Sequence, residues 1–293
     1  MFDLTEPTLA DQHWQAQAQA YRQRLENFLT PQLARIDAGD PVPQFLFSYY
    51  SLRPAQLRAW NPGYGVALAG PAALREYRGR RGYSMLDGKA AVSEQYLRHR
   101  VDTVTFVARL MRATGSRAAQ LNCFGLHEWA MVYRTEAVRH NHVALRLDSA
   151  AIDAVLESTP LRCTHFDAFR FFTPAAARRN NGTPSRVDQM DWEQPGCLHA
   201  NMDLYKWCYK LGPLISSDLL LACLELATAA REIDMRASPY DLSDYGYQPI
   251  PIETAAGRAE YVRHQNEIAL SAEPLRDTLL DRCEQLREIV ECK

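Results

Sequence analysis

Helical periodicity recurs through most of the chain and limits its possible folds more than any other feature. In residues 9–29, apolar side chains return at the spacing of one helix face: Trp14, Ala18, Tyr21, Leu25 and Phe28. Further helices are predicted over 91–112, 120–133, 197–211, 216–235, 253–270 and 272–291. Thr30-Pro31 is expected to end the first helix, because proline lacks the backbone N–H that a helix interior needs. The chain is therefore predicted to be mainly α-helical.

Only a few short segments favour β-structure. Short strands are predicted at 66–68, 145–147 and 163–172, whereas 45–50 fits either a strand or a buried helix turn. The sequence shows no regular strand–helix alternation, no G-x-G-x-x-G and no Walker loop. The predicted fold class is α+β, mainly α with a few short strands, in a compact helical domain. A single domain over 1–293 is expected, with a small, basic, irregular lobe at about 61–90.

Composition indicates a globular protein of the cytoplasm. Hydrophobic residues make up 47% of the 293 residues, enough for a sizeable core. The N-terminus lacks the basic and apolar regions of a signal peptide, and no apolar run approaches the roughly 18 residues of a membrane span. Seven cysteines occur without a C-x-x-C pair, which is typical of reduced thiols rather than of a disulfide framework. We therefore expect a cytoplasmic protein with no membrane association.

The charge of the chain disfavours DNA as a partner. The formal net charge is −2 and the pI is about 6.5, whereas binding to phosphate backbones favours a basic surface. The charge is uneven, because residues 61–120 hold ten Arg or Lys and four Asp or Glu. This excess indicates either a solvated face that pairs with acidic residues elsewhere or an anion-binding patch around 75–89.

The most informative local pattern lies at the start of a predicted helix. His199, Asp203, Lys206 and Lys210 are spaced so that they share one stripe of that helix. An acid, a base and two amines on one stripe favour acid–base chemistry over an ordinary solvated face, which is the alternative. In this interpretation His199 is the general acid, and Asp203 or Glu193 orients water or stabilises an oxocarbenium-like sugar. Lys206 would serve as an amine nucleophile.

Histidines near carboxylates give a second interpretation, a non-haem metal site. Five of the eight histidines fall between residues 127 and 199. Two histidines and one carboxylate are a common ligand set for such sites, and iron, manganese or zinc would suit these donors. The candidate ligands are His165, Asp167, His199 and Asp203, with His127 and Glu128 as alternatives and the turn pair His140 and His142 as a weaker candidate. The other interpretation is that each carboxylate orients a structural histidine.

Aromatic and arginine side chains supply a candidate binding surface. Three aromatic residues are predicted to stack a planar ligand such as a nucleobase: Trp192, Tyr205 and Trp207. Ordinary core packing is the alternative. Arg236 and Arg258 are expected to help close a pocket over a neighbouring loop. A second long loop, 173–196, is expected to be functional or disordered, because structureless loops of this length are uncommon in compact domains.

Four stretches spread over nearly the whole chain carry a family resemblance: Phe45–Pro54, Gly125–Tyr133, Glu193–Trp207 and Asp234–Leu242. They resemble a bacterial family commonly labelled 3-methyladenine DNA glycosylase. The resemblance implies a nucleobase-containing substrate and cleavage of an N-glycosidic bond. The Gly/Pro-rich hairpin of helix-hairpin-helix glycosylases is not seen in this sequence.

Three functions follow from these patterns. The first is a hydrolase that acts by acid–base chemistry on a nucleobase-containing substrate, either a small molecule or DNA, which the charge disfavours. The second is a non-haem His/carboxylate metalloenzyme, oxidative or hydrolytic. The third is a non-catalytic helical binding protein. Sensitivity to chelators separates the second from the first.

Overall fold

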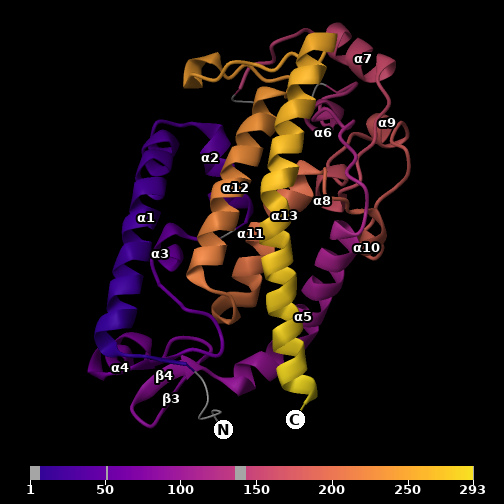
Figure 1. The fold of residues 1–293 in the computed structure, drawn as a ribbon. Helices are drawn as coiled ribbons and strands as arrows, with labels where there is room; N and C mark the ends of the chain where they lie inside the picture. The colour runs from indigo at the N-terminus through magenta and orange to yellow at the C-terminus, as the bar shows by residue number, and fades with distance from the viewer. Residues whose placement is uncertain (1–6, 51, 136–142, 293) are drawn as a thin grey trace. The chain divides into compact units, whose positions relative to one another are not determined.

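The computed structural model describes residues 7–50, 52–135 and 143–292 (Figure 1). About 62% of the chain is helical and 6% is in strands, so the predicted class, mainly α with a few short strands, is confirmed. Within the described residues, no helix has both the length and the apolar character that a bilayer crossing requires.

The chain forms two compact units, each made of separate segments. Unit 1 comprises residues 1–111, 204–225 and 275–293, and unit 2 comprises 112–203 and 226–274. The division falls inside four long helices, which each contribute residues to both units: α5 (Glu94–Gly115), α11 (Leu198–Leu211), α12 (Ser217–Arg236) and α13 (Ala255–Glu291). The single domain expected from the sequence stays a prediction.

Unit 1 combines helices with a small sheet of strand order β1-β2-β4-β3. β1 and β2 are parallel, and the β2–β4 and β4–β3 pairs are antiparallel. Asp87 and Gly88 connect β3 to β4, both with positive φ, as a two-residue hairpin turn requires. The sheet therefore lies largely in the predicted basic lobe. The elements are β1 (Thr8–Leu9), α1 (Asp11–Asp37), α2 (Pro41–Tyr49), α3 (Pro54–Leu57), β2 (Ala67–Ala69), α4 (Pro71–Tyr77), β3 (Tyr83–Leu86), β4 (Lys89–Val92) and η1 (Gly212–Leu214).

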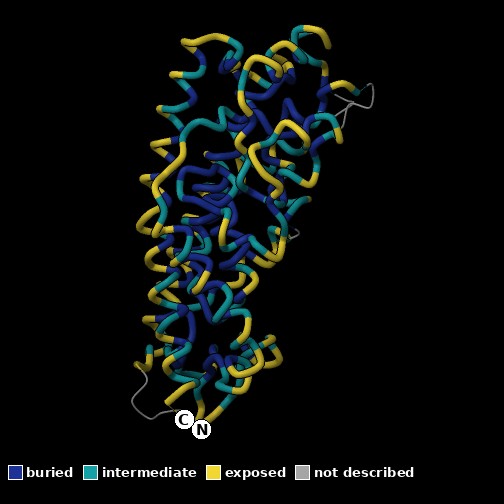
Figure 2. The backbone as a smooth tube through the Cα atoms, turned by 90° about the vertical axis from the view of Figure 1, so that its right-hand side faces the viewer, coloured by how far each residue is buried: buried dark blue, intermediate teal, exposed yellow. Residues whose placement is uncertain are grey.

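One face of α1 supplies much of the core of unit 1. Four of its buried residues are those predicted, Trp14, Ala18, Tyr21 and Leu25, and Leu29 is buried in place of the predicted Phe28. The ring of Trp14 lies 6.5 Å from that of Trp60 and 5.8 Å from that of Tyr77. Buried and exposed positions alternate along the helices accordingly (Figure 2). The helix is thus held by apolar packing of one stripe.

Tyr21 makes the stability of unit 1 sensitive to alkaline pH. Its hydroxyl donates to the carbonyl oxygen of Leu57 at 2.7 Å, and burial raises its pKa to about 12. Below pH ~10 this tyrosine is protonated in both the folded and the unfolded chain. Between pH ~10 and 12 the unfolded chain ionises first, so stability is lost as pH rises. We expect Tyr21→Phe to lower the free energy of unfolding by about 1 kcal/mol at pH 8. We also expect the stability of this variant to fall less between pH 8 and 11 than that of the unchanged protein. Urea unfolding of both proteins at pH 8 and 11 measures this, and equal declines would contradict it.

Unit 2 combines short helices with the parts of the four long helices that belong to it (Figure 1). Arg146 joins two of its loops, because its guanidinium contacts Glu253 at 2.9 Å and its backbone N–H donates to Pro239. Leu145 forms an isolated antiparallel bridge with Tyr240, which is all the β-structure found at the predicted strand 145–147. The short elements are α6 (Leu126–Ala130), α7 (Ser149–Ser158), α8 (Phe166–Phe169), α9 (Pro174–Ala177), α10 (Gln189–Trp192) and η2 (Ser243–Tyr245).

Two helix ends predicted from the sequence are wrong. α1 continues through Pro31 to Asp37, and α13 is one helix of 37 residues that contains Pro274, where two helices were expected. An internal proline removes only one helical hydrogen bond. Leu29 before the first proline and Ala272 before the second are fully buried, so packing offsets that loss.

Three other segments differ from their predictions, and one ambiguous run is resolved. The expected strand at 163–172 is instead the short helix α8, because the backbone of Cys163 pairs with the side chain of Asn180 rather than with a strand. The ambiguous run at 45–50 belongs to helix α2. The helix expected over 120–133 is reduced to α6, and the long loop 173–196 contains α9 and α10.

Candidate functional site

Two groups of metal-type donors, buried except for the half-buried His199, lie next to each other in unit 2. We call them the His165 triad (His165, Glu193 and Asp203) and the His199 triad (His127, His199 and Asp234). Within each triad, one ligand atom from each residue lies within 4.8 Å of the others. Together the two triads supply three imidazoles and three carboxylates.

The ends of short helices position the His165 triad. His165 is the N-cap residue of α8, Glu193 is the C-cap residue of α10, and Asp203 follows in the second turn of α11. His165 Nε2 lies 3.2 Å from Asp203 Oδ2 and 3.3 Å from Glu193 Oε1. Gln189 donates to the same Glu193 oxygen and fixes its orientation. One imidazole nitrogen thus faces two carboxylate oxygens.

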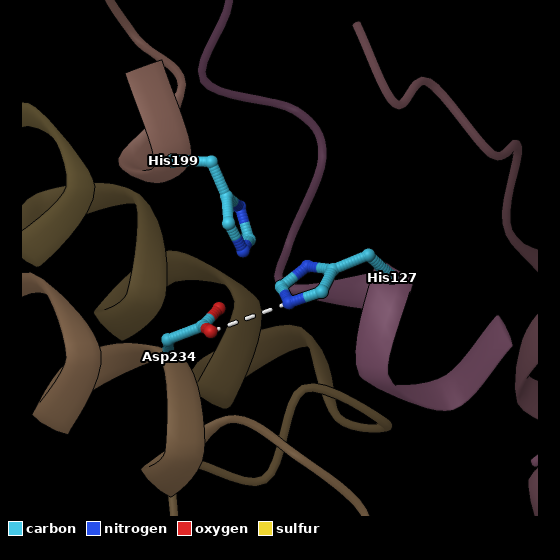
Figure 3. Close-up of side chains that lie close together, drawn as sticks. All are labelled: His127, His199 and Asp234. Atoms are coloured by element: carbon cyan, nitrogen blue, oxygen red, sulfur yellow. Dashed lines mark ion pairs between the residues drawn. The ribbon is translucent and has the colours of Figure 1, made fainter. Parts of the chain in front are cut away.

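The His199 triad draws on three helices, α6, α11 and α12. The rings of His127 and His199 both turn toward the carboxylate of Asp234 (Figure 3), and His127 Nε2 lies 3.2 Å from Asp234 Oδ2. The buried guanidinium of Arg231 donates to that same Oδ2 at 2.9 Å and to Glu128 Oε1 at 2.9 Å. Asp234 Oδ1, also buried, accepts no hydrogen bond from the described residues.

The ring of His199 connects the two triads. Its centroid lies 4.4 Å from that of His127, at a right angle, and 5.3 Å from that of His165, with an angle of 27° between the planes. His127 and His165 therefore lie on either side of a shared neighbour. The six donors form one His/carboxylate cluster.

The two histidines of the His199 triad have opposite pKa shifts. Burial is the largest single influence on the pKa of His127 and lowers it, but Asp234 and Glu128 together outweigh burial and raise the pKa to about 10. Burial and then the charge of His127 lower the pKa of His199 to about 3. Burial acts to raise the pKa of Asp234, but His127 and Arg231 hold it below its usual value. At neutral pH, His127 is an imidazolium and His199 a neutral imidazole.

A small pocket reaches the His199 triad. It has a volume of about 20 Å³, which holds about one or two water molecules. All three residues of the His199 triad line it, whereas those of the His165 triad do not. Its other walls include Cys123, Cys163, Cys197 and Tyr261. Burial raises the pKa of the Cys163 thiol to about 12, so this thiol is neutral and gives the wall a weakly polar character.

A tight turn before α11 sets the start of the helix that carries His199. Gln194 Oε1 accepts hydrogen bonds from the backbone N–H groups of Gly196 and Gln120, at 2.7 and 2.8 Å. Gln265 donates to the carbonyl oxygen of Gly196 at 2.6 Å, and Asn201 donates to that of Pro195. These bonds fix the direction in which α11 begins.

Gly196→Ala is expected to destabilise the protein by about 1–3 kcal/mol. A Cβ atom at this position would lie 2.6 Å from the carbonyl oxygen of Gln120 and 2.9 Å from its backbone nitrogen. Backbone atoms cannot rotate away as a flexible side chain can, so the turn itself must shift. The denaturant midpoint of the variant measures the cost. A midpoint equal to that of the unchanged protein would contradict the close packing.

The structure brings together only some of the site residues predicted from the sequence. His127, Glu128, Glu193, His165, His199 and Asp203 all lie in the cluster or against it. Asp167 does not take part, because its carboxylate is bound by Arg186 at 2.8 Å and lies 3.4 Å from Arg170. His140 and His142 lie outside the described residues.

The predicted substrate-binding residues of unit 2 have other neighbours. Trp192 packs against the backbone at Gly182. Arg236 donates to the carbonyl oxygen of Gln248, and Arg258 to that of Ile252, so both stabilise a loop.

The remaining predicted residues belong to unit 1. Tyr205 packs its ring against Tyr50, and Trp207 packs against Phe106. The buried Lys206 places its Nζ 4.7 Å from the centre of the Trp207 ring, whereas Lys210, on the predicted stripe, is exposed.

Sequence reasoning missed Asp234 and Arg231. The available signal was a pair of opposite charges three positions apart, and so on one face of α12, next to the buried Ala230 and Met235, with Glu232 as a third charge between them. Buried charges are costly unless paired, so such a pair beside buried residues indicates a partner elsewhere in the fold. That partner is the His127–Glu128 pair of α6.

Comparison of the chain with protein-family models, with curated proteins and with solved structures finds no match. The glycosylase resemblance therefore stays a prediction.

Proposed function

We propose that the protein is a non-haem metal-dependent enzyme whose substrate-accessible metal position is the His199 triad. One observation carries this proposal: two histidines and one carboxylate, from three helices, converge on the wall of a pocket. This donor set, with room beside it for a further ligand, is typical of non-haem metal enzymes. Buried sites in helical proteins are built in the same way, from side chains on facing helices.

The donors favour iron or manganese, with zinc as the alternative, because only nitrogen and oxygen atoms converge. An ion held there would supply an open coordination position for oxidation or hydrolysis of a small substrate. Asp234 Oδ1 would be the carboxylate oxygen that binds the ion, because Arg231 and His127 contact the other oxygen, Oδ2. An ion that binds His127 must displace its proton. The small pocket supports a substrate of few atoms.

We propose that the protein works in a reducing compartment, the cytoplasm. All seven cysteines are free thiols, including Cys208 and Cys223, whose sulfur atoms lie 3.7 Å apart. Close thiols that remain unpaired are typical of proteins from a reducing environment.

The metal content of protein purified without a metal-affinity step tests the proposal. We expect iron or manganese at about one equivalent or more per chain. Removal by a chelator should lower the melting temperature, and Mn²⁺ at about 100 times its Kd should return about 2.7 kcal/mol of stability. Protein that holds no metal and gains no stability from Mn²⁺, Fe²⁺ or Zn²⁺ would overturn the proposal.

One observation supports the other candidate, acid–base cleavage of a nucleobase-containing substrate. The pKa values of His127, about 10, and His199, about 3, place an acid beside a base, so the general acid predicted at His199 would instead be His127. In that case, release of free base from alkylated DNA or a nucleoside would persist in chelator. Loss of activity with the metal would exclude this candidate.

A further inference from the structure

We propose that the His165 triad is a second metal site, so that the protein binds two ions next to each other. The inference rests on the proposed function, because it adds a second ion to a centre at the His199 triad. The ligand is a divalent cation of the same class, Mn²⁺ or Fe²⁺. The two sites differ in access: one faces the pocket, and the other is closed.

The spacing of the donors supports this second site. Nitrogen and oxygen ligands lie about 2.0–2.2 Å from a bound ion, which places neighbouring ligands about 3.0–3.5 Å apart in tetrahedral or octahedral geometry. In the His165 triad, Nε2 lies 3.2 Å from Asp203 Oδ2 and 3.3 Å from Glu193 Oε1. Both distances match the separation expected between two neighbouring ligands of one ion.

Burial indicates a closed position. His165 is 2% exposed, and Glu193 and Asp203 are each 1% exposed. None of them lines the pocket that reaches the His199 triad. Closed coordination by protein ligands is typical of ions that stay bound, whereas catalytic ions keep an open position. The ion at the His165 triad would therefore remain in place while the one at the His199 triad exchanges ligands.

The position of His199 makes the two sites neighbours. Its ring stacks on the ring of His165 and meets the ring of His127 edge-on, so the His199 side chain contacts both triads. α11 carries one donor for each site, His199 for one and Asp203 for the other, one helical turn apart. Two-metal sites in other proteins hold their ions about 3.5–4 Å apart.

Mn²⁺ binding to the full chain, stripped of metal, tests the inference. We expect two equivalents of Mn²⁺ by calorimetry and an electron paramagnetic resonance spectrum broadened by the magnetic interaction of two neighbouring ions. Asp203→Asn and, as a milder change, Glu193→Gln should each bind one equivalent and show the spectrum of isolated Mn²⁺. Asp167→Asn is the matched control, since this buried carboxylate pairs with Arg186 and should keep both ions.

The outcomes separate this inference from the proposed function. One equivalent in the unchanged protein, lost in His199→Ala and kept in Asp203→Asn, would overturn the second site and leave the proposed function standing. One equivalent lost in Asp203→Asn and kept in His199→Ala would overturn both. A folded protein that binds no Mn²⁺ would also overturn both. Two equivalents that fall to one in Asp203→Asn and Glu193→Gln, but not in Asp167→Asn, establish the second site.

Discussion

Replacing Arg231 with methionine is expected to destabilise the protein by about 3–5 kcal/mol, because removal of one partner leaves buried charges uncompensated. Arg231 is 2% exposed and donates to both Glu128 and Asp234. Methionine fills part of the volume but cannot donate, so both carboxylates lose their shared guanidinium. Urea unfolding at pH 7, in the presence of a chelator, measures the loss.

Two further variants make this result specific. Arg236→Met changes an arginine on the same helix whose side chain is 22% exposed and should cost less than about 1 kcal/mol. Adding Glu128→Gln to Arg231→Met removes one of the two abandoned charges and should recover part of the stability. A loss below about 1 kcal/mol for Arg231→Met would contradict the central role of this guanidinium.

His199→Ala is expected to weaken binding of Mn²⁺ at the pocket-facing position by about 100-fold or more, since even indirect partners of a metal ligand contribute about 10–100-fold. The low pKa of His199, about 3, leaves its imidazole unprotonated and ready to coordinate at neutral pH. Mn²⁺ titration followed by calorimetry measures the affinity.

The control for this variant is another histidine beside carboxylates. His264 lies 3.2 Å from Glu267 and 3.9 Å from Glu260 on the surface of α13, so His264→Ala should bind Mn²⁺ as the unchanged protein does. Equal affinity in His199→Ala and in the unchanged protein would exclude His199 as a ligand.

Regular helices could be predicted from the sequence because their apolar residues follow a local rule. The helices expected at 197–211 and 216–235 match α11 and α12 to within one residue at each end. The helix breaks predicted at Pro31 and near Pro274 were wrong because they depend on contacts that are not local in sequence. Whether a helix survives a proline depends on packing by residues distant in the sequence, which periodicity does not report.

The candidate site could be predicted in part. His165, His199 and Asp203 were selected because histidine and carboxylate recur at short spacing, and the fold does bring them together. Asp167 was selected because a strand would place it on the same face as His165, but the local chain is helical and turns it toward Arg186. Asp234 reaches the cluster only through the packing of α12 and has no histidine near it in sequence.

The discontinuous make-up of unit 2 bears on when metal can bind during synthesis. Both its segments, 112–203 and 226–274, are needed to form the unit, and the second carries Asp234. Contacts between distant segments form only after the entropy of closing the intervening chain has been overcome. A nascent chain released only as far as residue 203 would already carry every donor of the His165 triad, yet only His127 and His199 of the other. The donors proposed for the closed position are therefore synthesised before the last donor of the pocket-facing position, but both positions form only once the second segment completes unit 2.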